Sequence, residues 1–95
     1  MRTSMGLILG ALGCGALLAG CSTLGEIRQA SDQLAQAKAA GAEQKAPYEY
    51  TSADLYLQMA AEEKSEWDWG AASEWAQKSV MYSGQALNKA KGGAQ

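Results

Sequence analysis

The 95-residue chain contains no histidine, no phenylalanine and one proline. Histidine is the commonest general base and metal ligand of proteins, so its absence removes the usual route to both chemistries. No nucleophile stands in a recognisable pattern with a base. The sequence therefore predicts a protein that is not an enzyme, with no catalytic residue, no metal site and no small-molecule substrate.

Long hydrophobic runs are also missing. The apolar run before Cys21, Met5 to Gly20, has 16 residues and carries five glycines. A helix that spans a membrane needs about 20 apolar residues, so this stretch is short for a permanent anchor. It follows the positively charged Arg2 and ends in small residues, a pattern typical of a secretory signal peptide.

The apolar run ends on Leu18-Ala19-Gly20-Cys21, which resembles the lipobox of bacterial lipoproteins. The resemblance implies a thioether-linked diacylglycerol on Cys21 and cleavage between Gly20 and Cys21. An acyl chain such as palmitate would then cap the new amine, and no other cofactor is expected. The second cysteine, Cys14, has Ala11 three positions before it, so we expect it to leave with the signal peptide.

Two alternatives to this interpretation are an uncleaved anchor and a plain secretory signal cut nearby.

Three acyl chains would hold the protein permanently, whereas a single chain binds a membrane only marginally. Ser22 follows the cysteine, where an aspartate would resemble an inner-membrane retention signal. The resemblance therefore implies the outer membrane of a Gram-negative bacterium, on its periplasmic side, with membrane lipid as the first partner.

The chain from Cys21 onwards supports one small domain. In a chain shorter than about 70–80 residues, the hydrophobic core rarely supplies more than about 3–5 kcal/mol of stability. Cys21 is the only cysteine after the cleavage site, so no internal disulfide can add to that stability. Seven basic and ten acidic side chains remain after cleavage. This acidic balance argues against binding to nucleic acid, which needs a basic surface.

The pattern of small and apolar residues predicts an all-α fold with three helices after the cleavage site. The first helix should start at a capping box made by Thr23 and Glu26 and end near Gly41. A polar connector should lead to a second helix from about Pro47 to Ser65.

Asp68 is expected to cap the last helix, which would run to about Ala90. That helix carries a row of mainly small residues at alternating spacings of three and four, which predicts a tightly packed seam: Trp69, Ala72, Ala76, Ser79, Ser83, Ala86 and Ala90.

The last two helices should form an antiparallel hairpin. The predicted organisation is a signal peptide at 1–20, a lipidated N-terminus with the first helix and connector at 21–45, a helical hairpin at 46–91 and a disordered tail at 92–95. The first helix would either pack across the hairpin or extend as a stalk.

The segment from Ala46 to Ala90 is similar to an alanine-rich family of unknown function in bacterial envelope lipoproteins. The similarity rests on Ala46-Pro47-Tyr48-Glu49-Tyr50-Thr51-Ser52-Ala53 and on Asp68-Trp69-Gly70-Ala71-Ala72. The hairpin also resembles a single tetratricopeptide unit, although Ala76 stands where that repeat has a large aromatic. Neither resemblance implies an activity or a catalytic residue.

All seven aromatic residues lie between Tyr48 and Tyr82. A hairpin this small cannot bury all of them, unless they pack onto the first helix. We therefore expect a non-catalytic protein-interaction module for an envelope partner, with Trp67, Tyr56 and Tyr48 as partner-binding residues. The alternative is a self-associating structural lipoprotein. Pro47 argues against it, because a proline would interrupt the long helical rod that such a protein forms.

Overall fold

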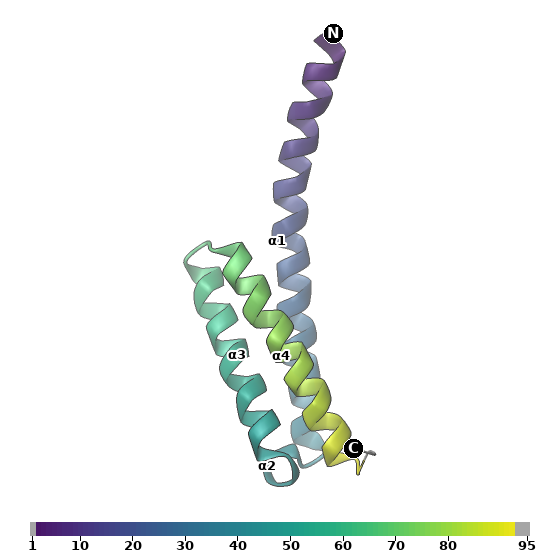
Figure 1. Cartoon of the computed structure of the whole chain (residues 1–95), viewed down its shortest axis with the longest axis vertical. Coiled ribbons are helices and arrows are strands. Elements are labelled where there is room, and N and C mark those ends of the chain that lie inside the picture. Colours follow the sequence, from purple (N-terminus) through teal and green to yellow (C-terminus); the bar gives the residue numbers. More distant parts are fainter. Residues whose placement is uncertain (1, 93–95) are drawn as a thin grey trace.

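The computed structural model describes the backbone of residues 2–92 and the side chains of residues 20–92. It contains four helices, α1 (Arg2–Ala39), α2 (Ala42–Lys45), α3 (Pro47–Ser65) and α4 (Trp69–Ala90), and no strand within residues 2–92. The predicted all-α class is confirmed. Figure 1 shows α3 and α4 as an antiparallel hairpin with the second half of α1 beside them. No helix within the described residues is both long and apolar enough to cross a membrane.

The sequence left open whether the first helix packs across the hairpin or extends as a stalk, and the position of α1 decides between them. From Thr23 onwards it packs on the hairpin, mainly against α4, through the buried residues Thr23, Ala30, Leu34 and Ala37. Its N-terminal part continues past the hairpin as a single helix (Figure 1). The segment after Cys21 is therefore a third member of the bundle.

The predicted capping box at Thr23 and Glu26 is wrong for the intact chain. The helix already runs through this point from Arg2, so the backbone amides of this turn lie inside the helix and need no cap. The Thr23 hydroxyl instead donates to the carbonyl oxygen of Trp69 at 3.4 Å. The Glu26 carboxylate accepts hydrogen bonds from Ser22 on α1 and from Ser73 on α4.

The connector between α1 and α3 departs from the prediction as well. Gly41 adopts the left-handed conformation, with φ of 88°, and so ends α1 as expected of a glycine. The polar stretch after it forms the one-turn helix α2, because Ala42 and Ala46 are buried against α1 and the end of α4. The described chain thus has one more helix than the three predicted after the cleavage site.

The hairpin agrees closely with the prediction. Helix α3 begins at Pro47 and ends at Ser65, and the Asp68 carboxylate caps α4 by accepting from the backbone N–H of Ala71 at 3.1 Å. Proline at a first helical position lacks only an amide that would have no partner in the helix.

The centre of the bundle is made of very small side chains. On α4 the predicted seam is buried except for its first member, Trp69, which is half-buried; the buried members are Ala72, Ala76, Ser79, Ser83, Ala86 and Ala90. The largest side chains with no exposure are serines, Ser79 and Ser83. Ser79 donates to the carbonyl oxygen of Ala53 on α3 at 2.7 Å, and Ser83 donates to Gln33 Oε1 on α1 at 3.1 Å. The helices therefore approach closely, and their larger side chains stand at the margins of the contacts.

Candidate functional site

Cys21 lies on α1 near the end of the bundle where the hairpin turns. Its thiol is free and exposed. Cys21, Leu24, Gly25 and Arg28 line a shallow depression of about 280 Å³ on the outward face of the helix. The sulfur is therefore accessible from the surface without unfolding of the bundle. Cys14 and the other side chains of the predicted signal peptide lie outside the described residues.

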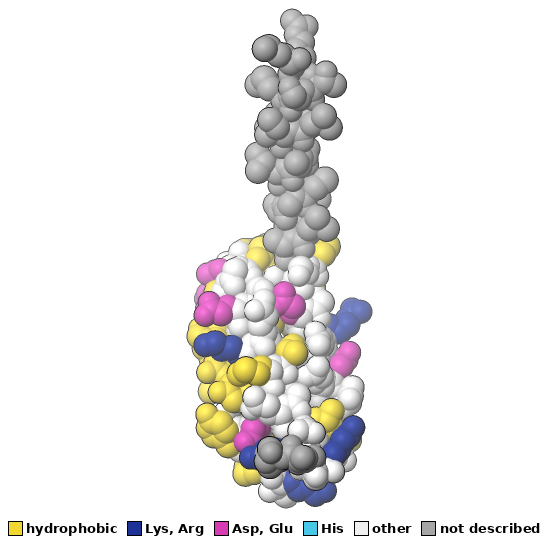
Figure 2. Space-filling view, turned by 45° about the vertical axis from the view of Figure 1, so that its right-hand side comes forward, with side chains coloured by type: hydrophobic (Ala, Val, Ile, Leu, Met, Phe, Trp, Pro, Cys, Tyr) yellow, Lys and Arg dark blue, Asp and Glu magenta, His cyan; other side chains and the backbone are white. Residues whose placement is uncertain are grey.

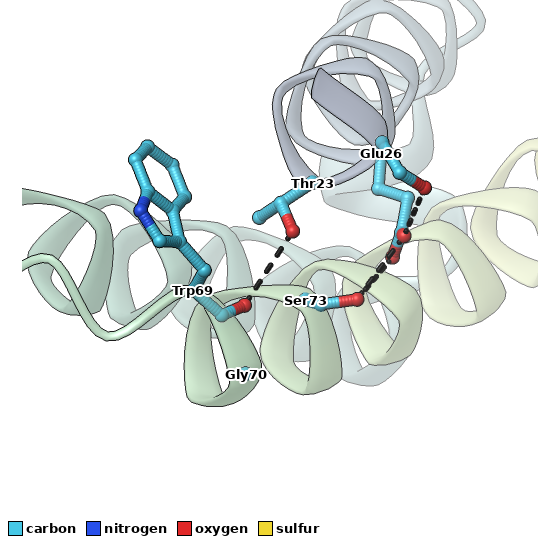
Figure 3. Close-up of a pocket in the computed structure, with 6 residues that line it drawn as sticks. Thr23, Glu26, Trp69, Gly70 and Ser73 are labelled. Atoms are coloured by element: carbon cyan, nitrogen blue, oxygen red, sulfur yellow. Dashed lines mark hydrogen bonds between the residues drawn. The ribbon is translucent and has the colours of Figure 1, made fainter. Parts of the chain in front are cut away.

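A second shallow depression, of about 310 Å³, separates α1 from the start of α4. Figure 3 shows Thr23 reaching the backbone of Trp69, and Glu26 reaching Ser73. These hydrogen bonds join α1 to α4 and give the polar groups that line the depression partners within the chain. No buried side-chain nitrogen or oxygen among the described residues lacks a partner, so this depression offers no unpaired group for a ligand.

Trp67 occupies an unusual place in the turn between α3 and α4. Its backbone φ is 62°, the left-handed region, and its amide donates to the carbonyl of Lys64 while that of Asp68 donates to the carbonyl of Glu63. This pair of bonds is the helix-ending motif whose left-handed position is normally glycine. The indole is 78% exposed, with the edge-on ring of Trp69 at 5.9 Å. The position therefore costs backbone energy and gives the ring little burial.

The structure does not bring the three predicted partner-binding residues together. Tyr48 starts α3 and Trp67 follows its end, so the two lie about 28 Å apart at 1.5 Å per residue. Tyr56 lies halfway between them and is half-buried. Trp67 therefore belongs to the turn, and Tyr48 and Tyr56 belong to a second aromatic group.

That second group lies between α3 and α4 and is named here the aromatic cluster: Tyr48, Tyr56, Trp75 and Tyr82. Tyr56 stacks on Trp75 and on Tyr82, each at 5.6 Å between ring centroids, and Tyr48 meets Tyr82 edge-on at 6.0 Å. The ammonium of Lys78 sits over the rings of Tyr56 and Trp75 at 5.5 and 5.1 Å. The pKa of the Tyr82 phenol is raised, chiefly by its hydrogen bond with Tyr48.

The helical period of α4 places Trp75 and Tyr82 on one margin of the seam, but it gives no sign that they stack with Tyr56. Tyr48 is 68% exposed, and two exposed aliphatic side chains, Leu55 and Met81, lie on the same pair of helices. Figure 2 shows hydrophobic side chains gathered along one edge of the bundle. Tyrosine and tryptophan are enriched among the residues that dominate protein interfaces.

Acidic residues surround the turn. Glu62, Glu63, Glu66 and Asp68 fall within seven residues. The pKa of the Glu63 carboxyl is raised, first by partial burial and then by the negative charges of Glu66, Asp68 and Glu62. In the part of the chain that the structure describes, no three such groups converge well enough to hold a metal ion.

The ion pair between Glu49 and Lys89 ties the start of α3 to the end of α4, with 2.8 Å between the Lys89 ammonium and Glu49 Oε1. The hydrogen bond from Lys89 is the main reason why the pKa of Glu49 lies below its ordinary value of 4.5. A lowered folded-state pKa means that the unfolded chain binds the proton more readily. The pair therefore stabilises the fold at neutral pH, and this contribution is lost as the pH falls below about 4.5.

We expect Glu49→Gln to lower the thermal midpoint at pH 7, and the difference from the parent chain to shrink as the pH falls toward 3. Thermal melts followed by circular dichroism across this range measure it. Glu43→Gln is the control, because Glu43 meets Lys38 at 3.7 Å between exposed side chains and such pairs contribute little. A constant difference at all pH values would contradict the assignment.

The two tryptophans of the turn should differ in their contribution to stability. Trp69 is half-buried, and burying half of an indole is worth about 2–3 kcal/mol, so Trp69→Ala should lower the free energy of unfolding by about that amount. In Trp67→Gly, relief of the left-handed backbone offsets the lost ring contact, and the change should stay within about 1 kcal/mol. Urea denaturation of both variants provides the measurement. Equal large losses would place both rings in the core.

Searches of protein-family models, curated proteins and solved structures found no significant match to this chain. The resemblance to an alanine-rich envelope family and the resemblance to a tetratricopeptide unit therefore stay predictions, as does the lipobox.

Proposed function

We propose that the protein is a lipoprotein of the bacterial envelope. Residues 1–20 act as its signal peptide, and Cys21 carries the diacylglycerol and an N-terminal acyl chain. The observation that carries the proposal is the sequence Leu18-Ala19-Gly20-Cys21 at the end of a short apolar run. The exposed, unpaired thiol of Cys21 supports it. The serine after Cys21 favours the outer membrane of a Gram-negative cell, with the bundle in the periplasm.

The bundle itself is proposed to act as a non-catalytic protein-interaction module. The aromatic cluster supports this role, because Tyr48 and part of Tyr56 remain accessible, and the same two helices also expose Leu55 and Met81. Tyrosine and tryptophan provide most of the energy in many protein interfaces. Trp67, at the far end of α3, is not part of this surface.

Mass spectrometry of the chain produced in a Gram-negative host tests the anchoring. The mature N-terminal peptide should begin at Cys21 and carry the mass of a diacylglyceryl thioether and one further acyl chain. Labelled palmitate should enter the same peptide. A chain that begins elsewhere and has a free Cys21 thiol would overturn the proposal.

A photo-crosslinking residue tests the partner surface in the native envelope. Placed at Tyr48 it should give a crosslink to a distinct protein, and Tyr56→Ala in the same chain should weaken that crosslink. The control position is Asn88, which is exposed and outside the aromatic cluster. The same crosslinks from positions 48 and 88 would argue against a dedicated surface.

The alternative is a structural lipoprotein that binds copies of itself. The exposed side chains of Leu55 on α3 and Met81 on α4 favour this alternative, because a second copy of the chain could cover them. Sedimentation of the lipidated chain in density-matched detergent separates the two proposals. A stable trimer or dimer supports the structural role, and a monomer supports the interaction module.

A further inference from the structure

The turn between α3 and α4 lies at the same level of the bundle as Cys21. The Thr23 hydroxyl, two residues after Cys21, bonds to the backbone of Trp69 at 3.4 Å. A methyl group added to Gly20, one residue before Cys21, would lie 3.9 Å from the Trp69 ring. Figure 3 shows the Trp69 indole beside this part of α1. The proposed lipid attachment point and the two tryptophans of the turn therefore share one end of the molecule.

This end of the bundle exposes two large apolar side chains. Trp67 is 78% exposed and Leu24, one helical turn after Cys21, is 43% exposed. Trp67 also stands at a left-handed backbone position that glycine would occupy more easily. Within the described chain its ring contact is Trp69. Packing inside the bundle thus gives little reason for a large ring at this position.

We propose that Trp67, Trp69 and Leu24 form a membrane-contact surface that lies in the headgroup region of the bilayer to which Cys21 is anchored. This inference rests on the proposed lipoprotein function. Cleavage after Gly20 would remove that residue from the Trp69 ring and leave the indole open on the side of the acyl chains. Tryptophan prefers this region of a membrane, because its ring is apolar and its N–H needs a polar partner.

The geometry also orients the bundle. The acyl chains on Cys21 hold one end of α1 at the membrane, and the turn beside it touches the same lipid surface. The opposite end, with α2 and Tyr48, then points away from the membrane (Figure 1). The aromatic cluster is left accessible to a periplasmic protein. The acidic residues around the turn indicate neutral lipid rather than anionic lipid as the contact surface.

Quenching of tryptophan fluorescence by brominated lipid tests the contact. The full chain is produced with its own signal peptide, purified in lipidated form and placed in phosphatidylcholine vesicles with plain or brominated acyl chains. One variant keeps Trp67 alone, through Trp69→Phe and Trp75→Phe. The matched control carries Tyr48→Trp with all three native tryptophans changed to Phe. Tyr48 is similarly exposed but lies at the start of α3, away from the turn.

The brominated lipid should reduce the emission of Trp67, because an interfacial ring lies close to the acyl chains, and should leave the emission of the control nearly unchanged. Unchanged emission from Trp67, or equal quenching of both chains, would overturn the proposal; the former would also be expected if the turn bound a protein. The mass of the N-terminal peptide that contains Cys21, measured in the same preparation, separates the membrane-contact proposal from the lipoprotein proposal. A lipidated chain without quenching defeats the membrane-contact surface alone, whereas a chain without lipid defeats both proposals.

Discussion

Replacement of Cys21 by alanine is expected to abolish lipid attachment and the processing that follows it. The thioether needs the cysteine sulfur, and no other thiol follows the cleavage site. The Cys21→Ala chain should incorporate no palmitate and should keep its residues 1–20. Labelling with palmitate and the electrophoretic size of the product measure both effects, which should be all or none.

Cys14→Ala is the matched control, because it removes the other cysteine and leaves Leu18-Ala19-Gly20-Cys21 intact. Its mature product should equal that of the parent chain. Cys21 is exposed, so its replacement should not disturb the bundle, and circular dichroism of both variants checks this. If the Cys21→Ala chain were still found as a mature, acylated membrane protein, the proposed anchoring would be wrong.

The hairpin could be predicted from sequence because its signals are local. Pro47 marks the start of α3, Asp68 caps α4, and the regular spacing of small residues on α4 reports directly which face is buried. Each signal acts within a few residues of the chain. Such short-range effects do not depend on how distant elements pack.

The start of α1 and the connector could not be predicted in the same way. Thr23 and Glu26 have the spacing of a capping box, yet their side chains bond to Trp69 and Ser73, which lie 46 and 47 residues away. Helix α2 forms because Ala42 and Ala46 are buried by α1 and α4. The cap is absent because α1 already runs through Thr23 from Arg2, and tertiary burial decides the formation of α2, so no local pattern encodes either outcome.

The candidate site was predictable only in part. Cys21 follows from a contiguous motif, and the exposure of Trp67 follows from its place outside the helical row of α4. The stacking of Tyr56 between Trp75 and Tyr82 depends on how α3 and α4 are aligned along their axes. Sequence spacing within one helix does not fix that alignment, so Tyr48, Tyr56 and Trp67 could not be sorted into two separate surfaces.

Substitution of Ala76 by leucine is expected to destabilise the bundle more than any surface change. Ala76 has no exposed surface and lies in the middle of the row of small buried residues on α4. No fully buried side chain in the described residues is larger than serine, so the added isobutyl group can fit only if the helices move apart. Overpacking of this kind costs about 1–3 kcal/mol. A core of this size rarely supplies more than about 3–5 kcal/mol, so much of the stability is at stake.

Thermal denaturation should show the Ala76→Leu midpoint lower by about 10 °C, since 1 kcal/mol shifts a domain of this size by about 4–8 °C. Asn88→Leu is the matched control, because it places the same side chain at an exposed position of the same helix, where surface changes stay within about 0.5 kcal/mol. If the helices are closely spaced at the seam, the thermal midpoint of Ala76→Leu should lie well below that of Asn88→Leu. Equal midpoints would show that α4 can turn its small face away from α1 and α3, and that the bundle is not held by the close approach of its helices.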